Sequence, residues 1–276
     1  MIIWIASYPK SGNTWVRAII STYLNFNNNN PFENILKIKR FPNFSQFKEI
    51  INLEDLKKDR LQICKYWLSA QKRINSDNKI TFLKTHNLNG NVNGNMFTNS
   101  ENTIGFIYLV RDPRSVVVSI ANHNGISIDK AINNLLNINM IGTNPTMVNN
   151  DLINLVEFRS SWKAHYLSWT KSSYSKLIIR YEDLHSNTFN VAKEILNFIK
   201  SYKNIEINDH KLKDTINICN FENLSKLEKS VGFTEKVKGS FFRKGKIDDW
   251  KNELSKDQIK KIESAFSEEM KELNYL

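Results

Sequence analysis

A lysine, two hydroxyl residues and a glycine crowd into one short segment, residues 8–15, with the sequence YPKSGNTW. Lys10 carries a full positive charge, and Ser11 and Thr14 add hydroxyl donors. A turn at Gly12 that leads into a helix would add backbone N–H groups and the positive end of the helix dipole. This combination suits an anion, most simply a phosphate. The order differs from a Walker motif, in which the lysine follows the second glycine, so an ordinary solvated turn remains an equal interpretation of this segment alone.

A second candidate for chemistry is His86, at the end of the short run TFLKTH over residues 81–86. Imidazole has a pKa near neutrality, so it can serve as a general base toward an acceptor hydroxyl. A single histidine at a strand end is nevertheless more often an ordinary surface residue. The position alone leaves both interpretations open.

Two basic segments lie further along the chain. Residues 108–119, YLVRDPRSVVVS, place Arg111 where an apolar run meets a helix, and residues 240–252, SFFRKGKIDDWKN, form a basic loop. A guanidinium matches the geometry of a terminal phosphate. The plainer alternatives are an arginine that pairs with a carboxylate and a solvated loop.

Short apolar runs predict the strands that would carry these residues, at residues 2–7, 81–86, 105–110 and 177–183. Helical spacing predicts helices at 16–24, 33–39, 53–74, 115–122, 129–139, 155–171, 189–202 and 255–273. The expected caps are Thr14, Asp112 (followed by Pro113) and Ser255. Loops are expected at 25–47, 87–102 and 140–150. Strands that alternate with helices predict an α/β fold of three layers, with a central parallel sheet flanked by helices, as in P-loop proteins.

The composition is that of a globular protein, with 41% hydrophobic residues, and predicts one domain over residues 1–276. No apolar run reaches about 18 residues and no leader pattern is present, so no membrane segment is expected. With two cysteines, Cys64 and Cys219, a reducing cytoplasm is the expected location. The net charge of +11 does not by itself separate nucleic acid, an acidic surface and a small polyanion as ligands.

Taken together, the segments 8–15, 84–86, 108–119 and 240–252 resemble those of the sulfotransferases that use 3′-phosphoadenosine 5′-phosphosulfate (PAPS) and release 3′-phosphoadenosine 5′-phosphate (PAP). The resemblance spans nearly the whole chain. It implies that His86 is the catalytic base, that Lys10 stabilises the leaving phosphate and that Lys84 reaches the sulfuryl oxygens. It also implies a donor-binding set of Lys10, Ser11, Gly12, Asn13, Thr14, Trp15, Arg111, Ser119, Tyr181, Phe221, Phe241, Arg243, Lys244 and Gly245. Asp248 stands where the family usually has glycine, and we expect the loop to form with some local change because aspartate tolerates positive φ better than most residues.

A sulfotransferase of this kind uses no metal and acts on a small-molecule, lipid or glycan acceptor, with no nucleic acid involved. The acceptor is expected to be enclosed by residues 25–47, 87–102 and 140–154. Two alternatives stay open: a P-loop kinase of small molecules and a polyanion-binding protein without catalysis. A kinase needs Mg²⁺ held by a loop Ser/Thr and a strand-end Asp, and the sequence offers no convincing Walker-B strand. The oligomeric state is not predicted.

Overall fold

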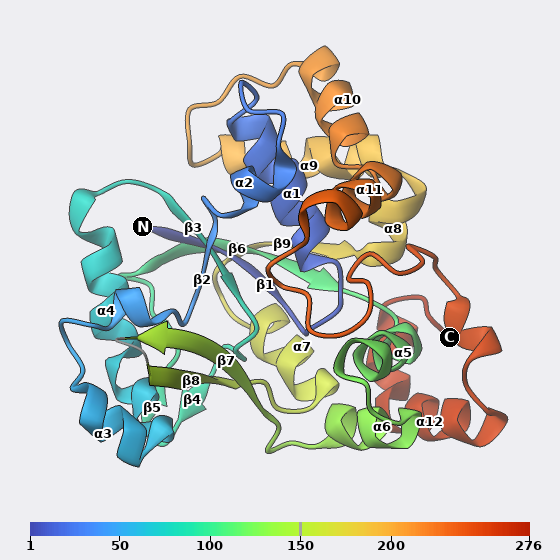
Figure 1. Ribbon diagram of the computed structural model, residues 1–276, viewed down its shortest axis with the longest axis horizontal. Coiled ribbons are helices and arrows are strands. Elements are labelled where there is room, and N and C mark those ends of the chain that lie inside the picture. Colours follow the sequence, from blue (N-terminus) through green and yellow to red (C-terminus); the bar gives the residue numbers. More distant parts are fainter. Residues whose placement is uncertain (149–150) are drawn as a thin grey trace. The chain divides into compact units, whose positions relative to one another are not determined.

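The computed structural model describes residues 1–148 and 151–276 (Figure 1). The chain folds into two compact units, each built from separate segments. Unit 1 comprises Met1–Tyr8, Ile38–Tyr108 and Asn137–Ile178, and unit 2 comprises Pro9–Lys37, Leu109–Leu136 and Ile179–Leu276. The expected loop 140–150 and acceptor wall 140–154 include positions 149–150, which lie outside the described residues.

A five-stranded parallel sheet is the centre of the fold, and it confirms the α/β prediction. Its order is β2 (Lys39–Arg40), β3 (Thr81–Thr85), β1 (Ile2–Ser7), β6 (Thr103–Val110) and β9 (Ser175–Arg180). Every residue of β1 is buried, as expected for a parallel strand covered on both faces. β1 pairs with β3 from Ile2 opposite Thr81 to Ala6 opposite Thr85. The sequence located four of these strands and missed β2, which has only two residues.

Aromatic side chains form the core of unit 1. Trp4 of β1 lies 5.1 Å from Phe97 and 5.4 Å from Phe41, measured between ring centroids. Trp169 of helix α7 (Trp162–Thr170) packs against Phe106 of β6 at 5.1 Å. These contacts hold α7 against the sheet, so residues on α7 can reach the ends of β3 and β6.

The single helix predicted over 53–74 is wrong. The structure has α3 (Leu53–Lys58), a 3₁₀ turn (Arg60–Tyr66) and α4 (Trp67–Ile74). Asp59 breaks the run because its backbone is extended (φ −143°, ψ 98°) and its side chain accepts a hydrogen bond from the Leu61 N–H. Asp is a residue that favours such caps over helix interiors.

The structure differs most from the sequence predictions over residues 140–171. β7 (Ile141–Val148) and β8 (Asp151–Phe158) pair as an antiparallel hairpin, where a loop and the first turn of a helix were expected. Helix α7 begins only at Trp162, because the Ser161 side chain caps it by accepting from the Ala164 N–H. The expected loop 87–102 likewise contains a short hairpin of β4 (Asn91–Val92) and β5 (Asn95–Met96).

Unit 2 is mainly helical in its described residues. Its helices are α1 (Asn13–Leu24), α2 (Pro31–Ile35), α5 (Pro113–Asn124), α6 (Ile128–Leu136), α8 (Tyr181–Ser186), α9 (Thr188–Lys200), α10 (Asp209–Ile218), α11 (Phe221–Val231) and α12 (Lys256–Glu272). The α2 helix is shorter than the one predicted over 33–39, and the strand predicted over 177–183 stops where α8 begins. α10 and α11 were not predicted. In the described chain, no helix has the length and apolarity that a membrane span requires.

Helix caps show where local sequence signals were sufficient. Asp112 caps α5 by accepting from the Arg114 N–H, with Pro113 at the first helical position, and Ser255 forms a capping box with Gln258. Both caps were predicted. The cap predicted at Thr14 is wrong: α1 begins at Asn13 after Gly12, whose φ is 96°.

Candidate functional site

The loop between β1 and α1 has the backbone of an anion cradle. Gly12 has φ 96°, and a Cβ there would lie 2.6 Å from Cδ2 of Tyr181, so position 12 admits only glycine without rearrangement. Ser11 is buried, and among the described residues no hydrogen-bond partner lies within reach of its Oγ. A buried hydroxyl with no protein partner is able to donate to a ligand or to water.

Lys10 is the cation of this loop. Its Nζ lies 4.0 Å from the centroid of the Phe241 ring. Lys10, the predicted leaving-group stabiliser, thus contacts Phe241, a predicted donor-binding residue. Burial lowers the pKa of Lys10 to about 8; Glu235 opposes this shift and Arg111 adds to it. The lowered pKa shows that the positive charge is incompletely compensated, a condition that an incoming anion would relieve.

Glu235 places a carboxylate at the same loop. It accepts hydrogen bonds from the Thr14 hydroxyl at 2.9 Å and from Arg17 at 2.7 Å. Both donors lie in the first turns of α1, the end of a helix that favours negative charge. Glu235 thus already accepts hydrogen bonds from Thr14 and Arg17, and a phosphate bound at this loop would compete for the same two donors.

Arg111, directly after β6, connects the loop to the later segments. Its guanidinium donates to the Lys10 carbonyl at 3.3 Å and to the Lys246 carbonyl at 3.2 Å, and it lies 4.2 Å above the Tyr181 ring. Its buried Nε has no hydrogen-bond partner among the described residues. Together with Ser11 Oγ and the Lys10 charge, this atom makes the surroundings suitable for a phosphorylated ligand.

Further residues of the predicted donor set, Asn13, Trp15, Ser119 and Tyr181, also lie in unit 2. Trp15 packs edge-on to Tyr181 at 6.0 Å and donates from its indole N–H to the Cys219 carbonyl. Asn13 is the first residue of α1. Ser119 is half-buried in the second turn of α5.

The basic segment after α11 is held by carboxylates. Arg243 and Lys244 both pair with Asp249 and Glu253, at 2.8 to 3.4 Å. Gly245 has φ 60°, and a Cβ there would lie 2.4 Å from the Phe221 ring. The Gly245 carbonyl accepts from Nε2 of His185 at 2.8 Å. The two basic side chains are therefore close together but already paired.

Two carboxylates fix the shape of this segment. Asp248, in the usual glycine position, does adopt a left-handed backbone with φ 64°, as the sequence led us to expect. Glu228 of α11 accepts from the backbone N–H groups of Phe241 and Phe242 and from the Ser240 hydroxyl. It thereby sets the position of Phe241, the ring beneath Lys10. Glu228 was not predicted, because nothing in the neighbouring sequence distinguishes it from an ordinary exposed helix residue.

His86 is buried in unit 1 at the end of β3. Its Nδ1 lies 2.7 Å from the Ser7 carbonyl, which can only accept, so the proton sits on Nδ1 and Nε2 keeps its lone pair. Burial lowers the pKa of His86 well below its usual value, and Lys84, two residues earlier, lowers it further. The imidazole is consequently neutral at physiological pH and can accept a proton at Nε2.

His165 of α7 holds the backbone of His86. Its Nε2 donates to the His86 carbonyl at 3.2 Å, and its Nδ1 accepts from the Tyr108 hydroxyl at 2.8 Å. Burial lowers the pKa of His165 to about 3, which keeps this ring neutral and the tautomer fixed. The sequence analysis gave His165 no role beyond its place in the helix predicted over 155–171, where it lies among Trp162, Tyr166 and Trp169.

An ionic cluster beside His86 was also missed. Glu157 of β8 is fully buried and binds Arg40 of β2 through both carboxylate oxygens, at 2.9 and 2.6 Å. Arg159 adds a third contact at 2.8 Å. The two arginines hold the pKa of Glu157 far below its usual value. No sequence signal pointed here, since Arg40 lay in an expected loop and Glu157 in an expected helix.

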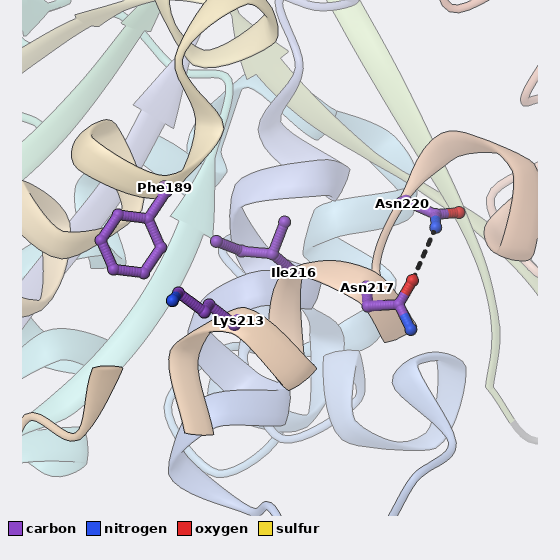
Figure 2. A pocket seen from close by; sticks show the side chains of 5 residues that line it. All are labelled: Phe189, Lys213, Ile216, Asn217 and Asn220. Atoms are coloured by element: carbon purple, nitrogen blue, oxygen red, sulfur yellow. Dashed lines mark hydrogen bonds between the residues drawn. The ribbon is translucent and has the colours of Figure 1, made fainter. Parts of the chain in front are cut away.

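The structure therefore divides the predicted site residues between the two units. Lys84 and His86 lie together in unit 1, whereas the anion loop, Arg111 and the segment around Arg243 lie together in unit 2. A separate open pocket of unit 2, drawn in Figure 2, is lined by Phe189, Lys213, Ile216, Asn217 and Asn220. It contains none of the predicted site residues.

Comparison with known proteins decides the family. Residues 2–274 match the family model described as "Sulfotransferase domain". The chain belongs to the sulfotransferase family. It is 28% identical over 277 residues to Sulfotransferase 1B1 of Canis lupus familiaris, covering 97% of this chain and 83% of that protein. It is 21% identical over 283 residues to Amine sulfotransferase of Oryctolagus cuniculus, covering 98% and 81%.

Solved structures show the same fold. A crystal structure of mouse sulfotransferase SULT7A1 complexed with PAP superposes with a TM-score of 0.62 at 19% identity, covering 98% of this chain and 84% of that one. The family model thus shows the sulfotransferase family, and the solved structure shows the parallel α/β fold.

Proposed function

We propose that this sulfotransferase moves the sulfuryl group of PAPS to a hydroxyl or amine acceptor and releases PAP. The observation that carries the proposal is the state of His86. Its Nδ1 proton is held by the Ser7 carbonyl and its pKa is lowered, so Nε2 is an unprotonated base at physiological pH. A relative of the same fold contains PAP, and the unpartnered donors at Ser11 and Arg111 fit a phosphorylated ligand.

Within this proposal the donor is bound at its two phosphates and its base. Residues 10–15 hold the 5′ end, and Arg111 and Ser119, with Arg243, Lys244 and Gly245, hold the 3′-phosphate. Tyr181 and Phe221 contact the adenine, and Phe241 belongs to the same donor-binding set, beside Lys10. The pairing of Arg243 and Lys244 with Asp249 and Glu253 means that a 3′-phosphate must compete with, or share, those carboxylates for the two cations.

The transfer follows from the charges. The acceptor oxygen or nitrogen forms a bond to sulfur as its proton passes to Nε2 of His86, and the bond from sulfur to the 5′-phosphate oxygen breaks. The phosphate takes the electron pair of that bond, and Lys10 stabilises the resulting charge. Lys84 contacts the sulfuryl oxygens. Cationic side chains do the neutralising in this scheme, with no metal ion.

We further propose that residues 1–276 act as one sulfotransferase domain on a small-molecule, lipid or glycan acceptor. The two cysteines are free and buried, which fits a site of action in the cytoplasm.

The test is transfer of labelled sulfate from PAPS across a panel of phenols, alcohols, amines, glycans and lipids. Transfer to at least one class, with PAP released in equal amount, is the expected result. Labelled ATP in the same panel tests the kinase alternative, and phosphoryl transfer in place of sulfuryl transfer would overturn the proposal. PAP binding without transfer to any acceptor would favour a non-catalytic anion-binding protein.

A further inference from the structure

Arg40, Glu157 and Arg159, here called the cationic cluster, have more positive than negative charge. The Glu157 side chain has no exposed surface, whereas those of Arg40 and Arg159 keep 25% and 18% of theirs. The carboxylate is thus covered by its partners, and a molecule that approaches the cluster meets guanidinium groups.

Arg159 is the surplus charge. Arg40 alone engages both oxygens of Glu157, through Nε at 2.9 Å and its terminal nitrogen at 2.6 Å, which is the bidentate geometry that satisfies a carboxylate. Arg159 adds a single contact to Oε2. A guanidinium has five N–H donors, and the buried Nε of Arg159 has no hydrogen-bond partner among the described residues.

The cluster lies beside the proposed base. Phe158, between Glu157 and Arg159, donates its N–H to the Asn87 side chain at 2.9 Å and accepts from the Leu88 N–H at 2.8 Å. These are the two residues that follow His86 in the chain. Arg40 stands opposite Lys84 in the sheet register. Both arginines are close enough to His86 to lower its pKa.

We propose that Arg159, supported by Arg40, binds an anionic group of the acceptor, such as a carboxylate, so that acceptors with a negative charge near the attacked hydroxyl or amine are preferred. The inference rests on the proposed function and names its acceptor class. A purely structural cluster would need only the bidentate Arg40 pair. The guanidinium of Arg159 supplies further N–H donors and a positive charge beside His86, where the acceptor would bind.

The test uses matched acceptors and one substitution. Each acceptor class is offered as a carboxylate and as its neutral amide, for example 4-hydroxyphenylacetate and 4-hydroxyphenylacetamide, and kcat and KM are measured for the wild type and for Arg159→Gln. We expect the wild type to prefer the carboxylate. Arg159→Gln should raise the KM for the carboxylate roughly 10–100-fold, the range for loss of a charge-assisted hydrogen bond. The KM for the amide should change less than about threefold.

Controls separate this role from folding. Glu157 keeps its bidentate partner Arg40 in Arg159→Gln, so the thermal midpoint should change little, and Arg159→Lys should restore part of the carboxylate preference. Arg73→Gln removes an exposed arginine of α4 that pairs with Glu49. It should change kcat and KM for neither acceptor. Equal losses for both acceptors, or a wild-type preference for the amide, would overturn the inference.

A second readout keeps the inference independent of turnover. Binding of the carboxylate and the amide to the PAP-loaded protein is measured by calorimetry. If no acceptor is sulfated, the proposed function fails, and stronger binding of the carboxylate that is lost in Arg159→Gln would still support the anion site. Equal binding of the two compounds would refute it.

Discussion

The lowered pKa of Lys10 predicts that PAP binds more weakly as the pH rises through 8. With a pKa of about 8 in the free protein, most Lys10 side chains are charged at pH 7 and few at pH 9. A bound phosphate stabilises the charged form and raises this pKa. The affinity is then almost fully present at pH 7 and falls as Lys10 of the free protein loses its proton around pH 8.

The size of the effect follows from the two pKa values. If the phosphate returns Lys10 to its ordinary pKa, the Kd for PAP rises about twofold at pH 8 and about tenfold at pH 9, relative to pH 7. The phosphates of PAP contribute little to the pH dependence of Kd above pH 7, since their second pKa is about 6. Burial raises the pKa of Tyr181 and that of Cys219, the latter to about 12, so these neighbours stay neutral.

Calorimetry at pH 7, 8 and 9, at constant ionic strength and in buffers of different ionisation heat, measures both Kd and proton uptake. Uptake should reach about half a proton at pH 8. Lys10→Arg keeps a charge at all these pH values, so its Kd should be flat. A wild-type Kd that does not change with pH, or the same slope in Lys10→Arg, would refute the assignment of Lys10 to the phosphate.

Two further substitutions test the donor site. Glu235→Gln removes the carboxylate at Thr14 and Arg17 and should tighten PAP binding roughly 3–10-fold at pH 6.5, since a like charge is lost; Glu222→Gln, on the exposed face of α11, is the matched control, and weaker or unchanged binding in Glu235→Gln would contradict the assignment. Arg243→Gln should weaken the binding of PAP roughly 10–100-fold, through loss of charge-assisted hydrogen bonds. The binding of the 3′-dephosphorylated nucleotide should weaken much less. An equal loss for both nucleotides would place Arg243 away from the 3′-phosphate.

Local signals carried the parts of the fold that the sequence predicted. The β1 strand is a continuous apolar run, and the caps at Asp112 and Ser255 depend on residues within three positions of each other. The anion loop was visible for the same reason, because its lysine, hydroxyls and glycine are neighbours in the chain.

The features that were missed depend on distant contacts. Arg40 and Glu157 are 117 positions apart, and His165 meets the His86 carbonyl across 79. β8 is a strand because it pairs with β7, and its apolar residues suit a helix equally well when read alone. Glu228 and Glu235 matter only because the segment after α11 folds back toward α1 in unit 2. A single sequence shows none of these pairings.

The central claim is that His86 is the base of sulfuryl transfer. The direct measurement is a single turnover of labelled PAPS on His86→Ala with a productive acceptor, beside the Kd for PAP. We predict that transfer falls roughly 10²–10⁴-fold, the usual share of general base catalysis, while the Kd stays within about threefold, since His86 is assigned to the acceptor and not to the donor. Transfer at the wild-type rate, or lost PAP binding with normal turnover of each bound complex, would contradict the claim.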